Sequence, residues 1–411
     1  MARILLAPNP TGTGHNMRML SIAKRLIEKT PNIEVIVLLG SRQDVFTNLF
    51  ENEGIKVIDL SPTGIIDYSK DSHLEKSMNW NTMISKYFVP TFFNGDKILK
   101  YLELIKDLSP DLLISDYNIN ASLAGIISGT HSVFVTERHN FTLVDVELDD
   151  LILGGFQVDK EEIGKAQQDL NSLFNWIISR TDLIITDKPL QEEFKSDIEL
   201  MSNKKTHFVG SMYSDMKKEV ELNFEKLLID PTRPYIIGTM SSTTMLKENL
   251  QKNIDFYKEA FLELKPLFPE LQLVIIGSSD IPRKENDIVE VPYIPNWRAL
   301  LEHSKLLISH SGWITVTEVA YLDVPALFYL SSFMEYHELE AFKRLNLIGV
   351  PVFSGYNVKE FCRKVSDLLK QKREKFTEGY RILNPTQHGI DLASDMIEEE
   401  IKKVVEEKER K

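Results

Sequence analysis

Short runs of hydrophobic residues alternate with longer amphipathic segments along most of the chain. Such runs are typical of strands buried on both faces, and the segments between them are typical of crossover helices. In the first half of the chain, strands are expected near 3–8, 33–39, 55–60, 110–115, 132–136, 182–186 and 206–209. In the second half they are expected near 234–239, 271–277, 288–291, 306–309, 325–330 and 350–353. This pattern predicts an α/β protein with doubly wound, Rossmann-like parallel sheets.

The pattern is interrupted between the two sets of strands. Residues 211–233 are polar and charged and contain Pro231, and a new strand follows them. A chain of 411 residues is long for one hydrophobic core and suits two domains of roughly 200 residues each. We therefore expect an N-terminal domain at 1–215, a linker at 216–233, a second domain at 234–385 and a C-terminal helix at 386–411.

Composition excludes several classes of protein. The net charge of −13 disfavours a nucleic-acid partner, because nucleic-acid-binding proteins carry basic surfaces. The single cysteine, Cys362, excludes an intrachain disulfide and fits a reducing compartment. The first apolar run is a strand rather than a signal peptide, and no window approaches the roughly 18 apolar residues of a transmembrane helix. We expect a cytoplasmic protein.

Aromatic side chains gather between residues 78 and 98, partly at helical spacing. They are expected to line an acceptor cleft or a plain core. The alternative is a face that docks on a membrane surface, in which case the protein lies at the inner face of the membrane and its acceptor is lipid-linked.

The segment after the strand at 306–309 carries the most informative chemistry. A strand that runs into Ser311-Gly312 at a helix start presents free backbone N–H groups and the positive end of the helix dipole, which favour a phosphate. Ser311, Thr315 and Glu318 are spaced i, i+4, i+7 and are expected to share one helix face. Two hydroxyls for a pyrophosphate and one carboxylate for a ribose predict a nucleotide-diphosphate site. The alternative is an ordinary capped helix.

The run from His310 to Glu318 resembles the nucleotide-sugar signature of inverting glycosyltransferases of the two-Rossmann-domain type, called GT-B. It is similar both to the UDP-glycosyltransferase superfamily and to the MurG-like N-acetylglucosaminyltransferases of peptidoglycan synthesis. The resemblance implies two Rossmann-like domains that face each other across a cleft. It also implies an inverting transfer of a sugar from a UDP-sugar to a hydroxyl of a small-molecule, glycan or lipid-linked acceptor. The related retaining enzymes carry a glutamate eight positions before Glu318, where this chain has His310, so that subclass is disfavoured.

The same resemblance extends to the first domain, where Gly12-Thr13-Gly14-His15 follows the first strand. In this class of enzyme the histidine lies at the acceptor hydroxyl, and a neutral imidazole is well suited to take a proton near pH 7. Asp116 ends another strand of the same sheet and is expected to orient His15 and to stabilise its protonated form. The alternative is that Asp116 only caps the next helix.

Further site residues are implied by the resemblance alone. The donor is expected to contact Gly14, Ser241, Ser242, Tyr293, Ile294, His310, Ser311, Gly312, Trp313, Thr315, Glu318, Glu335 and Glu338. Tyr293 would stack on the base, or would alternatively be a half-buried packing residue. Glu335 or Glu338, in the loop after Leu330, would hold the sugar hydroxyls. Glu137 is expected to bind the acceptor, whereas Arg138 and His139 are expected to hydrogen-bond at the domain interface. No metal and no cofactor is implied, because the UDP-sugar is itself the donor substrate.

Two other functions remain open. A UDP-sugar 2-epimerase shares the architecture, but that class should carry an arginine and a Thr-Glu-Arg-type run after the strand at 325–330, where this chain has Leu330-Ser331-Ser332. The other is a non-catalytic binder of sugar nucleotides or glycolipids, against which the pairing of His15 with Asp116 speaks.

Overall fold

The computed structural model describes residues 2–10, 13–40, 46–60, 88–213, 222–239, 247–294, 297–333, 336–372, 379–385 and 389–410. The chain divides into two compact units, and each is described by itself. Unit 1 comprises residues 1–215 and 385–411, and unit 2 comprises residues 216–384.

Unit 1 is built on a parallel sheet that is seven-stranded in the described residues, in the order β3-β2-β1-β4-β5-β6-β7. Its strands are β1 (Ala2–Pro8), β2 (Ile33–Leu39), β3 (Lys56–Asp59), β4 (Leu112–Asp116), β5 (Ser132–Thr136), β6 (Leu183–Thr186) and β7 (Thr206–Phe208). Every residue of β4, β5 and β6 is buried, which explains their uninterrupted apolar runs.

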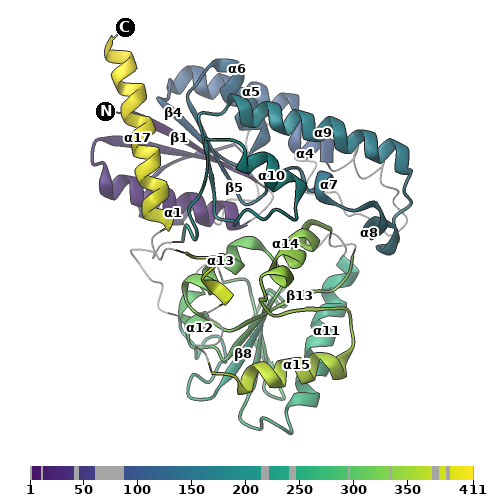
Figure 1. The fold of residues 1–411 in the computed structure, drawn as a ribbon. Coiled ribbons are helices and arrows are strands. Elements are labelled where there is room, and N and C mark those ends of the chain that lie inside the picture. The colour runs from purple at the N-terminus through teal and green to yellow at the C-terminus, as the bar shows by residue number, and fades with distance from the viewer. Residues whose placement is uncertain are drawn as a thin grey trace. The chain divides into compact units, whose positions relative to one another are not determined.

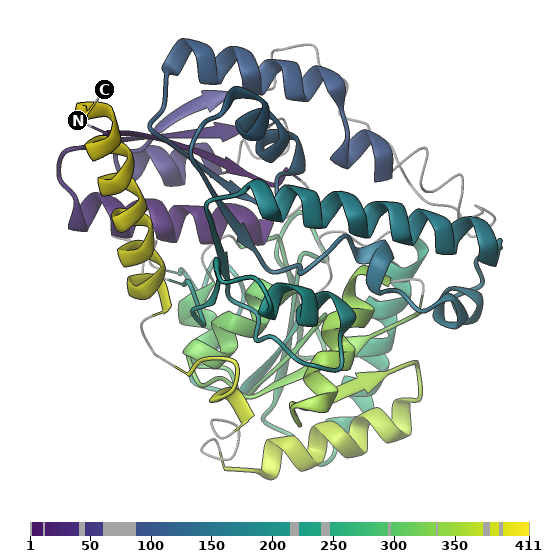
Figure 2. The same ribbon diagram turned by 45° about the horizontal axis from the view of Figure 1, so that its top comes forward.

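Helices cover both faces of this sheet (Figures 1 and 2). They are α1 (Thr13–Lys29), α2 (Thr47–Asn52), α4 (Val89–Phe92), α5 (Gly95–Leu108), α6 (Ile119–Ser128), α7 (Thr142–Asp145), α8 (Leu148–Leu153), α9 (Lys160–Arg180), α10 (Lys195–Met201) and α17 (Gly389–Arg410). Tyr101 and Ile105 of α5 share a buried cluster with Leu5 and Leu113 of the sheet, so α5 packs on one face.

The C-terminal helix α17 belongs to unit 1. Lys29 Nζ lies 2.6 Å from Asp395 Oδ1, and Arg25 also pairs with this helix through Asp391. Gly389, the first residue of α17, is required by close approach, because a Cβ there would lie 2.4 Å from the carbonyl oxygen of Ser211. The helix is therefore fixed by specific contacts to α1 and to the segment that follows β7.

Unit 2 holds a second sheet, in the order β10-β11-β9-β8-β12-β13-β14, which is parallel except for β10. Its strands are β8 (Tyr235–Thr239), β9 (Gln272–Ile276), β10 (Arg283–Glu285), β11 (Ile288–Val291), β12 (Leu306–Ser309), β13 (Ala326–Leu330) and β14 (Val352–Ser354). Its helices are α11 (Lys247–Leu264), α12 (Arg298–Glu302), α13 (Trp313–Tyr321), α14 (Tyr336–Leu347) and α15 (Val358–Lys370).

The expected fold class is confirmed, with three local differences. Strand β10 was not expected, because it is exposed and charged and is formed by a tight turn at Asn286 and Asp287, both with positive φ. The described part of the expected linker, 222–233, packs on unit 2, where Ile229 is buried in the core. The described aromatic residues of segment 78–98 include Phe88 and Phe92, which are buried against Phe141 and so form core; Trp80 and Tyr87 lie outside the described residues.

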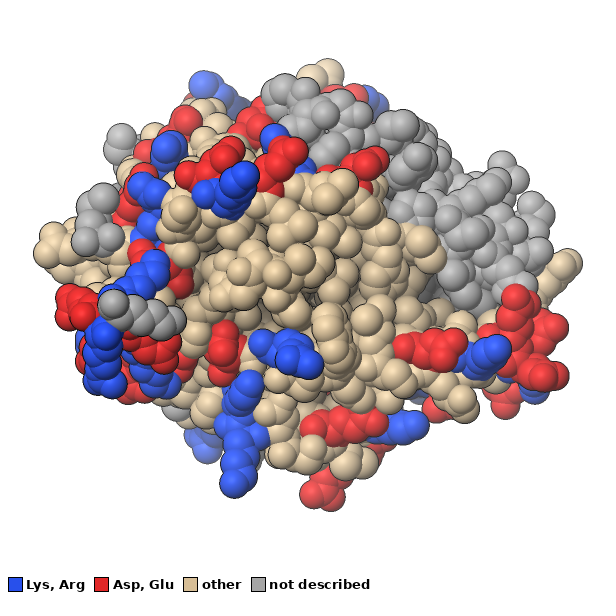
Figure 3. All heavy atoms as spheres, turned by 90° about the horizontal axis from the view of Figure 1, so that it is seen from above, with Lys and Arg blue, Asp and Glu red and all other residues tan. Residues whose placement is uncertain are grey.

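Charge on the surface is mixed in sign. Figure 3 shows acidic and basic side chains interspersed around a central area of uncharged residues on the face seen from above. In the part of the chain that the structure describes, no helix is both long and apolar enough to span a bilayer.

Candidate active site

Two neighbouring strands of unit 1 end in the same kind of tripeptide. Strand β5 ends at Thr136 and is followed by Glu137-Arg138, and β6 ends at Thr186 and is followed by Asp187-Lys188. In each, the threonine hydroxyl accepts a hydrogen bond from the backbone N–H of the basic residue, at 2.8 Å in the first and 3.1 Å in the second. Because Thr136 and Thr186 are register partners in the sheet, the two turns lie side by side and present their central carboxylates at one edge.

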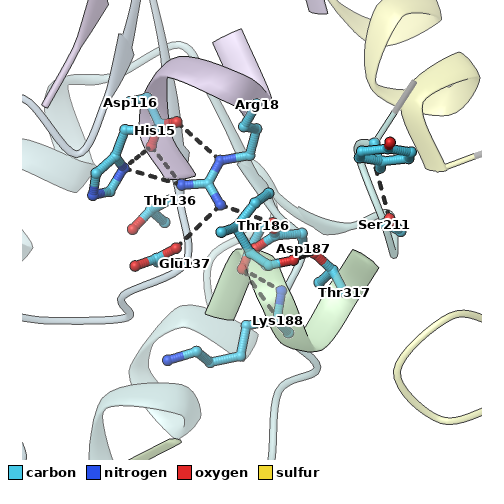
Figure 4. Close-up of polar contacts among 12 residues, drawn as sticks. His15, Arg18, Asp116, Thr136, Glu137, Thr186, Asp187, Lys188, Ser211 and Thr317 are labelled. Carbon is cyan, nitrogen blue, oxygen red and sulfur yellow. Dashed lines mark hydrogen bonds and ion pairs between the residues drawn. The ribbon is translucent and has the colours of Figure 1, made fainter. Parts of the chain in front are cut away.

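Arg18 binds these carboxylates together with that of Asp116, which ends β4 (Figure 4). Its guanidinium donates two hydrogen bonds to Asp116, from Nε to Oδ2 at 2.9 Å and from Nη2 to Oδ1 at 2.7 Å. Nη1 donates to Asp187 Oδ2 at 2.8 Å and to Glu137 Oε2 at 3.3 Å. The Arg18 side chain is fully buried, so one cation links the ends of three adjacent strands.

The charges in this cluster shift one another's pKa. Burial alone would lower the pKa of Arg18, but the carboxylates of Asp116, Asp187 and Glu137 outweigh it and raise that pKa well above its ordinary value. Burial favours the neutral form of Glu137, yet His15 in its protonated form and Arg18 overcome it and lower the pKa of Glu137 to about 2. For Asp187 burial prevails over the opposing effect of Arg18, and its pKa rises to about 6.

His15 lies in the first turn of α1 and contacts the same cluster. Its Nδ1 is 2.8 Å from Asp116 Oδ1, and its side chain is 5% exposed. Two acceptors would repel each other at this distance, so Nδ1 carries the proton and donates it to the carboxylate. Nε2 then keeps its lone pair, and among the described residues no hydrogen-bond partner is found for it. This is the arrangement that a general base requires.

The expected contact between His15 and Asp116 is therefore present. The alternative for Asp116 is wrong, since the N-cap of α6 is Asn118, whose side chain accepts from the N–H of Ala121 at 3.1 Å. Glu137 lies beside His15 at the same sheet edge, as the role in acceptor binding requires; that role stays a prediction. Gly14 lies between the β1 end and His15 within α1.

His139 forms two hydrogen bonds within unit 1, and its expected role at the domain interface stays a prediction. Its Nδ1 lies 2.6 Å from Asp197 Oδ1 and its Nε2 lies 3.0 Å from Thr186 Oγ1, and the ring is fully buried. Both ring nitrogens are used inside unit 1, so this histidine ties α10 to the end of β6 and offers no free base. Arg138 packs 5.3 Å from the ring centre of Tyr117 in the same unit.

A second histidine–carboxylate pair lies in unit 2, after β12. His310 Nδ1 is 2.5 Å from Glu338 Oε2, and both side chains are buried. His310 Nε2 faces the side-chain amide of Asn253 at 3.4 Å, and Asn253 is in turn bonded to the hydroxyl of Tyr356 at 2.8 Å. In contrast to His15, this ring has polar protein groups at both nitrogens.

Two donor-site expectations differ from the structure in position. Helix α13 begins at Trp313 with Gly312 as N-cap, so Ser311 precedes the helix and does not share a helical face with Thr315 and Glu318. The Ser311 hydroxyl donates to the backbone oxygen of Glu338 at 2.8 Å and is buried. Glu338 lies in the first turn of α14 rather than in a loop. The spacing rule failed because it assumed that the helix begins two residues earlier.

Glu318 lies in the second turn of α13. Its Oε2 accepts from the indole Nε1 of Trp297 at 3.0 Å, and burial raises its pKa to about 7 against the opposing effect of that bond. At the N-terminus of α13, the N-cap residue is Gly312, and no side-chain hydrogen bond caps the backbone N–H groups of the first turn. Both features suit a site for an anion followed by a polar group, as expected for a nucleotide.

The other expected residues have simpler positions. Trp313 is buried in the core, Thr315 is half-buried on α13, Ile294 packs against the core, and Tyr293 is 47% exposed, as stacking on a ligand requires. Ser241, Ser242 and Glu335 lie outside the described residues. Asp323, in the turn before β13, takes the left-handed conformation with φ 54°. Within the described ranges, no group of three or more potential metal ligands is found.

The sequence reasoning missed Arg18, Asp187 and Trp297. Arg18 is three residues after His15 on the same helix, so the helical period places it on the same face. Asp187 follows a buried strand directly, which is where ligand-binding residues of such sheets are found. Trp297 had no comparable signal, because its contact with Glu318 depends on the path of the loop before α12.

Comparisons with known proteins agree with this architecture. Residues 270–378 match the model of the glycosyltransferase family 28 C-terminal domain. The chain is 24% identical over 336 residues to the UDP-N-acetylglucosamine--N-acetylmuramyl-(pentapeptide) pyrophosphoryl-undecaprenol N-acetylglucosamine transferase of Alkaliphilus metalliredigens, covering 79% of this chain and 78% of that protein.

Solved structures share the whole fold. The calicheamicin glycosyltransferase CalG4 superimposes with a TM-score of 0.66 at 16% identity, covering 98% of each chain. A putative UDP-N-acetylglucosamine 2-epimerase from Listeria monocytogenes superimposes with a TM-score of 0.65 at 15% identity, covering 99% of this chain and 98% of that one. The protein therefore has the GT-B fold, and its residues 270–378 match the glycosyltransferase family 28 C-terminal domain; together these findings support a glycosyltransferase.

Proposed function

We propose that the protein transfers a sugar from a UDP-sugar to an acceptor hydroxyl with inversion at the anomeric carbon. The observation that carries the proposal is the pairing of His15 Nδ1 with Asp116 at 2.8 Å, which leaves Nε2 to act as the base. His15 Nε2 takes the proton of the acceptor hydroxyl while its oxygen attacks the anomeric carbon. The bond between that carbon and the UDP oxygen breaks, and UDP leaves with the electron pair.

Unit 2 would bind the donor. The uncapped N-terminus of α13 supplies backbone N–H groups for the diphosphate, and Glu318 supplies a carboxylate for the ribose hydroxyls. The backbone N–H groups and the dipole of α13 would offset the negative charge of the diphosphate, so we propose a transfer that needs no metal. Activity in excess EDTA would be unchanged, and a loss restored by a divalent cation would contradict this part.

The donor and the acceptor are tested together. The protein would be incubated with UDP-N-acetylglucosamine or UDP-glucose and one of three acceptors: a pyrophosphoryl-undecaprenol-linked sugar, a soluble glycan or a small-molecule alcohol. We propose the lipid-linked acceptor, because the relative from Alkaliphilus is named for one; contact with the membrane would then be peripheral. UDP release that depends on the acceptor, with an inverted anomeric centre in the product by NMR, supports the proposal.

A 2-epimerase is the second candidate, because three carboxylates beside His15 also supply the groups that remove and return a proton at a sugar carbon. Conversion of UDP-N-acetylglucosamine to its 2-epimer, without acceptor and with no transferred sugar, would replace the transferase by this function. Binding of UDP without either reaction would leave a non-catalytic binder.

A further inference from the structure

The Arg18 cluster contains more charge than a histidine–aspartate pair needs. Asp116 alone can orient His15, yet two more carboxylates, Glu137 and Asp187, lie at the same guanidinium. A buried cation held by three anions contributes little to stability by itself, because the cost of removing the charges from water offsets their attraction. The arrangement therefore calls for an explanation in terms of what it does to its neighbours.

The neighbour that matters is the His15 ring. Arg18 Nη2 lies 3.2 Å from His15 Nδ1, and both groups contact the same oxygen, Asp116 Oδ1. A fixed positive charge at this distance opposes a second positive charge on the ring. Asp116 and Glu137 have the reverse effect, since a carboxylate favours the protonated ring.

We propose that Arg18 is a positioning residue, which holds the Asp116 carboxylate in place for His15 and keeps the His15 ring in its neutral form. This inference rests on the proposed role of His15 as the base. Without Arg18, no cation would contact the ring, and Asp116 and Glu137 would favour the imidazolium, which cannot accept the proton of the acceptor.

The charged groups of this cluster come from four elements. Arg18 lies on α1 with His15 itself, Asp116 ends β4, Glu137 and Arg138 follow β5, and Asp187 and Lys188 follow β6. Three are cations and three are anions. Arg18 is the cation in contact with the ring, so its removal changes the local balance most.

The test measures the protonation of the His15 ring directly, in protein labelled with ¹⁵N-histidine. The His15 signal would be assigned by its loss in His15→Ala, and its titration followed by NMR in the ligand-free protein. In Arg18→Gln, which removes the charge and keeps a planar polar group, we expect the titration midpoint to rise by at least about one pH unit. The acid limb of the pH–rate profile should move by the same amount.

Two further variants separate charge from geometry. Arg18→Lys keeps the charge but lacks the fork that grips both Asp116 oxygens, so the midpoint should stay within about half a pH unit while kcat falls roughly tenfold with UDP affinity unchanged. If Arg18→Gln fails to fold, the double variant Arg18→Gln/Asp187→Asn has one buried anion fewer. Its titration midpoint should still rise above that of the wild type, although by less than in Arg18→Gln, because the guanidinium that contacts the ring in the wild type is lost.

Arg344→Gln is the matched control, since Arg344 is a buried arginine paired with Glu340 on α14 of unit 2. It should leave the His15 titration where it is in the wild type. A His15 midpoint that is also unchanged in folded Arg18→Gln or in the double variant would overturn the inference. Because the titration needs no substrate, it decides this point even if the wild-type protein transfers no sugar, a result that would count against the proposed function alone.

Discussion

Each unit of this protein places a histidine against a carboxylate just after a buried strand or at the helix that follows one, and the two pairs differ in what surrounds them. His15 donates to Asp116, has a guanidinium 3.2 Å away and has no described partner at Nε2. His310 meets Glu338 at one nitrogen and the amide of Asn253 at the other. A histidine–carboxylate pair is therefore not by itself a catalytic motif. Whether the ring can accept a proton depends on the partner of its second nitrogen and on the charged group nearest to the ring.

The largest expected effect tests this difference at His15. His15→Ala should lower turnover by roughly 10²–10⁴-fold, because it removes the general base, and should leave UDP affinity unchanged. Steady-state kinetics and UDP titration by calorimetry measure the two quantities. Asp116→Asn should also lower turnover at unchanged UDP affinity. A loss of UDP binding in either variant would place these residues in the donor site.

Glu318→Ala tests the donor side. Loss of a charge-assisted hydrogen bond to the ribose should weaken UDP binding by on the order of 1.5–3 kcal/mol, or about 10–150-fold in Kd. The wild-type protein should show a Tm that rises with UDP concentration, and this rise should shrink in the variant. A larger rise with GDP or dTDP in the wild type would show that the nucleotide is not uridine.

Glu318 should also cost stability at neutral pH. Its folded-state pKa of about 7 lies above the ordinary value of 4.5, so its contribution to stability is present below pH 4.5 and is lost as the pH rises through 7. Glu318→Gln keeps the bond from Trp297 and removes this loss. We expect the variant to gain on the order of 1–3 kcal/mol in the free energy of unfolding at pH 8, and nothing at pH 4. Denaturant titrations at both pH values measure the free energy of unfolding. Equal stability of Glu318→Gln and the wild type at pH 8 would speak against a buried ionised carboxylate.

His310→Ala gives the direct counterpart of His15→Ala. Removing the ring takes away the contact with Glu338 that supports the segment before α13, so UDP affinity should fall by about tenfold. Turnover at saturating donor should change less than fivefold, a rough bound for a residue that is not the base. A fall in turnover as large as that of His15→Ala, at unchanged UDP affinity, would reverse the assignment of the two histidines.

The smallest expected effect concerns Tyr356, which is bonded to Asn253, the neighbour of His310 Nε2. Tyr356→Phe removes the hydroxyl bonded to Asn253 and keeps the ring, so UDP affinity should weaken by about threefold or less. The same calorimetric titration measures it. An effect that exceeds that of His310→Ala would mean that Asn253, rather than His310, is the group that the donor needs.

Much of the fold could be predicted because buried parallel strands have uninterrupted apolar runs, as in β4, β5 and β6. The charged edge strand β10 has no such run, since its residues face solvent and it pairs only with β11 through a tight turn. The contact of His15 with Asp116 followed from the rule that strand ends meet at one edge. Asp187 obeys the same rule and was overlooked. The contacts of Ser311 and Glu338 were beyond reach, because they depend on the residue at which α13 and α14 begin.

Unit 1 is completed by a segment that the ribosome makes only after the whole of unit 2. Helix α17 follows residues 216–384 in the chain, yet its acidic side chains pair with Lys29 on α1, and Glu400 lies 2.6 Å from His131, just before β5. During synthesis, unit 1, which carries His15 and Arg18 on α1, therefore lacks the cover of α17 until the whole of unit 2 has been made. A nascent chain arrested after residue 384 should thus be cleaved by proteases near α1, in a region that the finished protein covers.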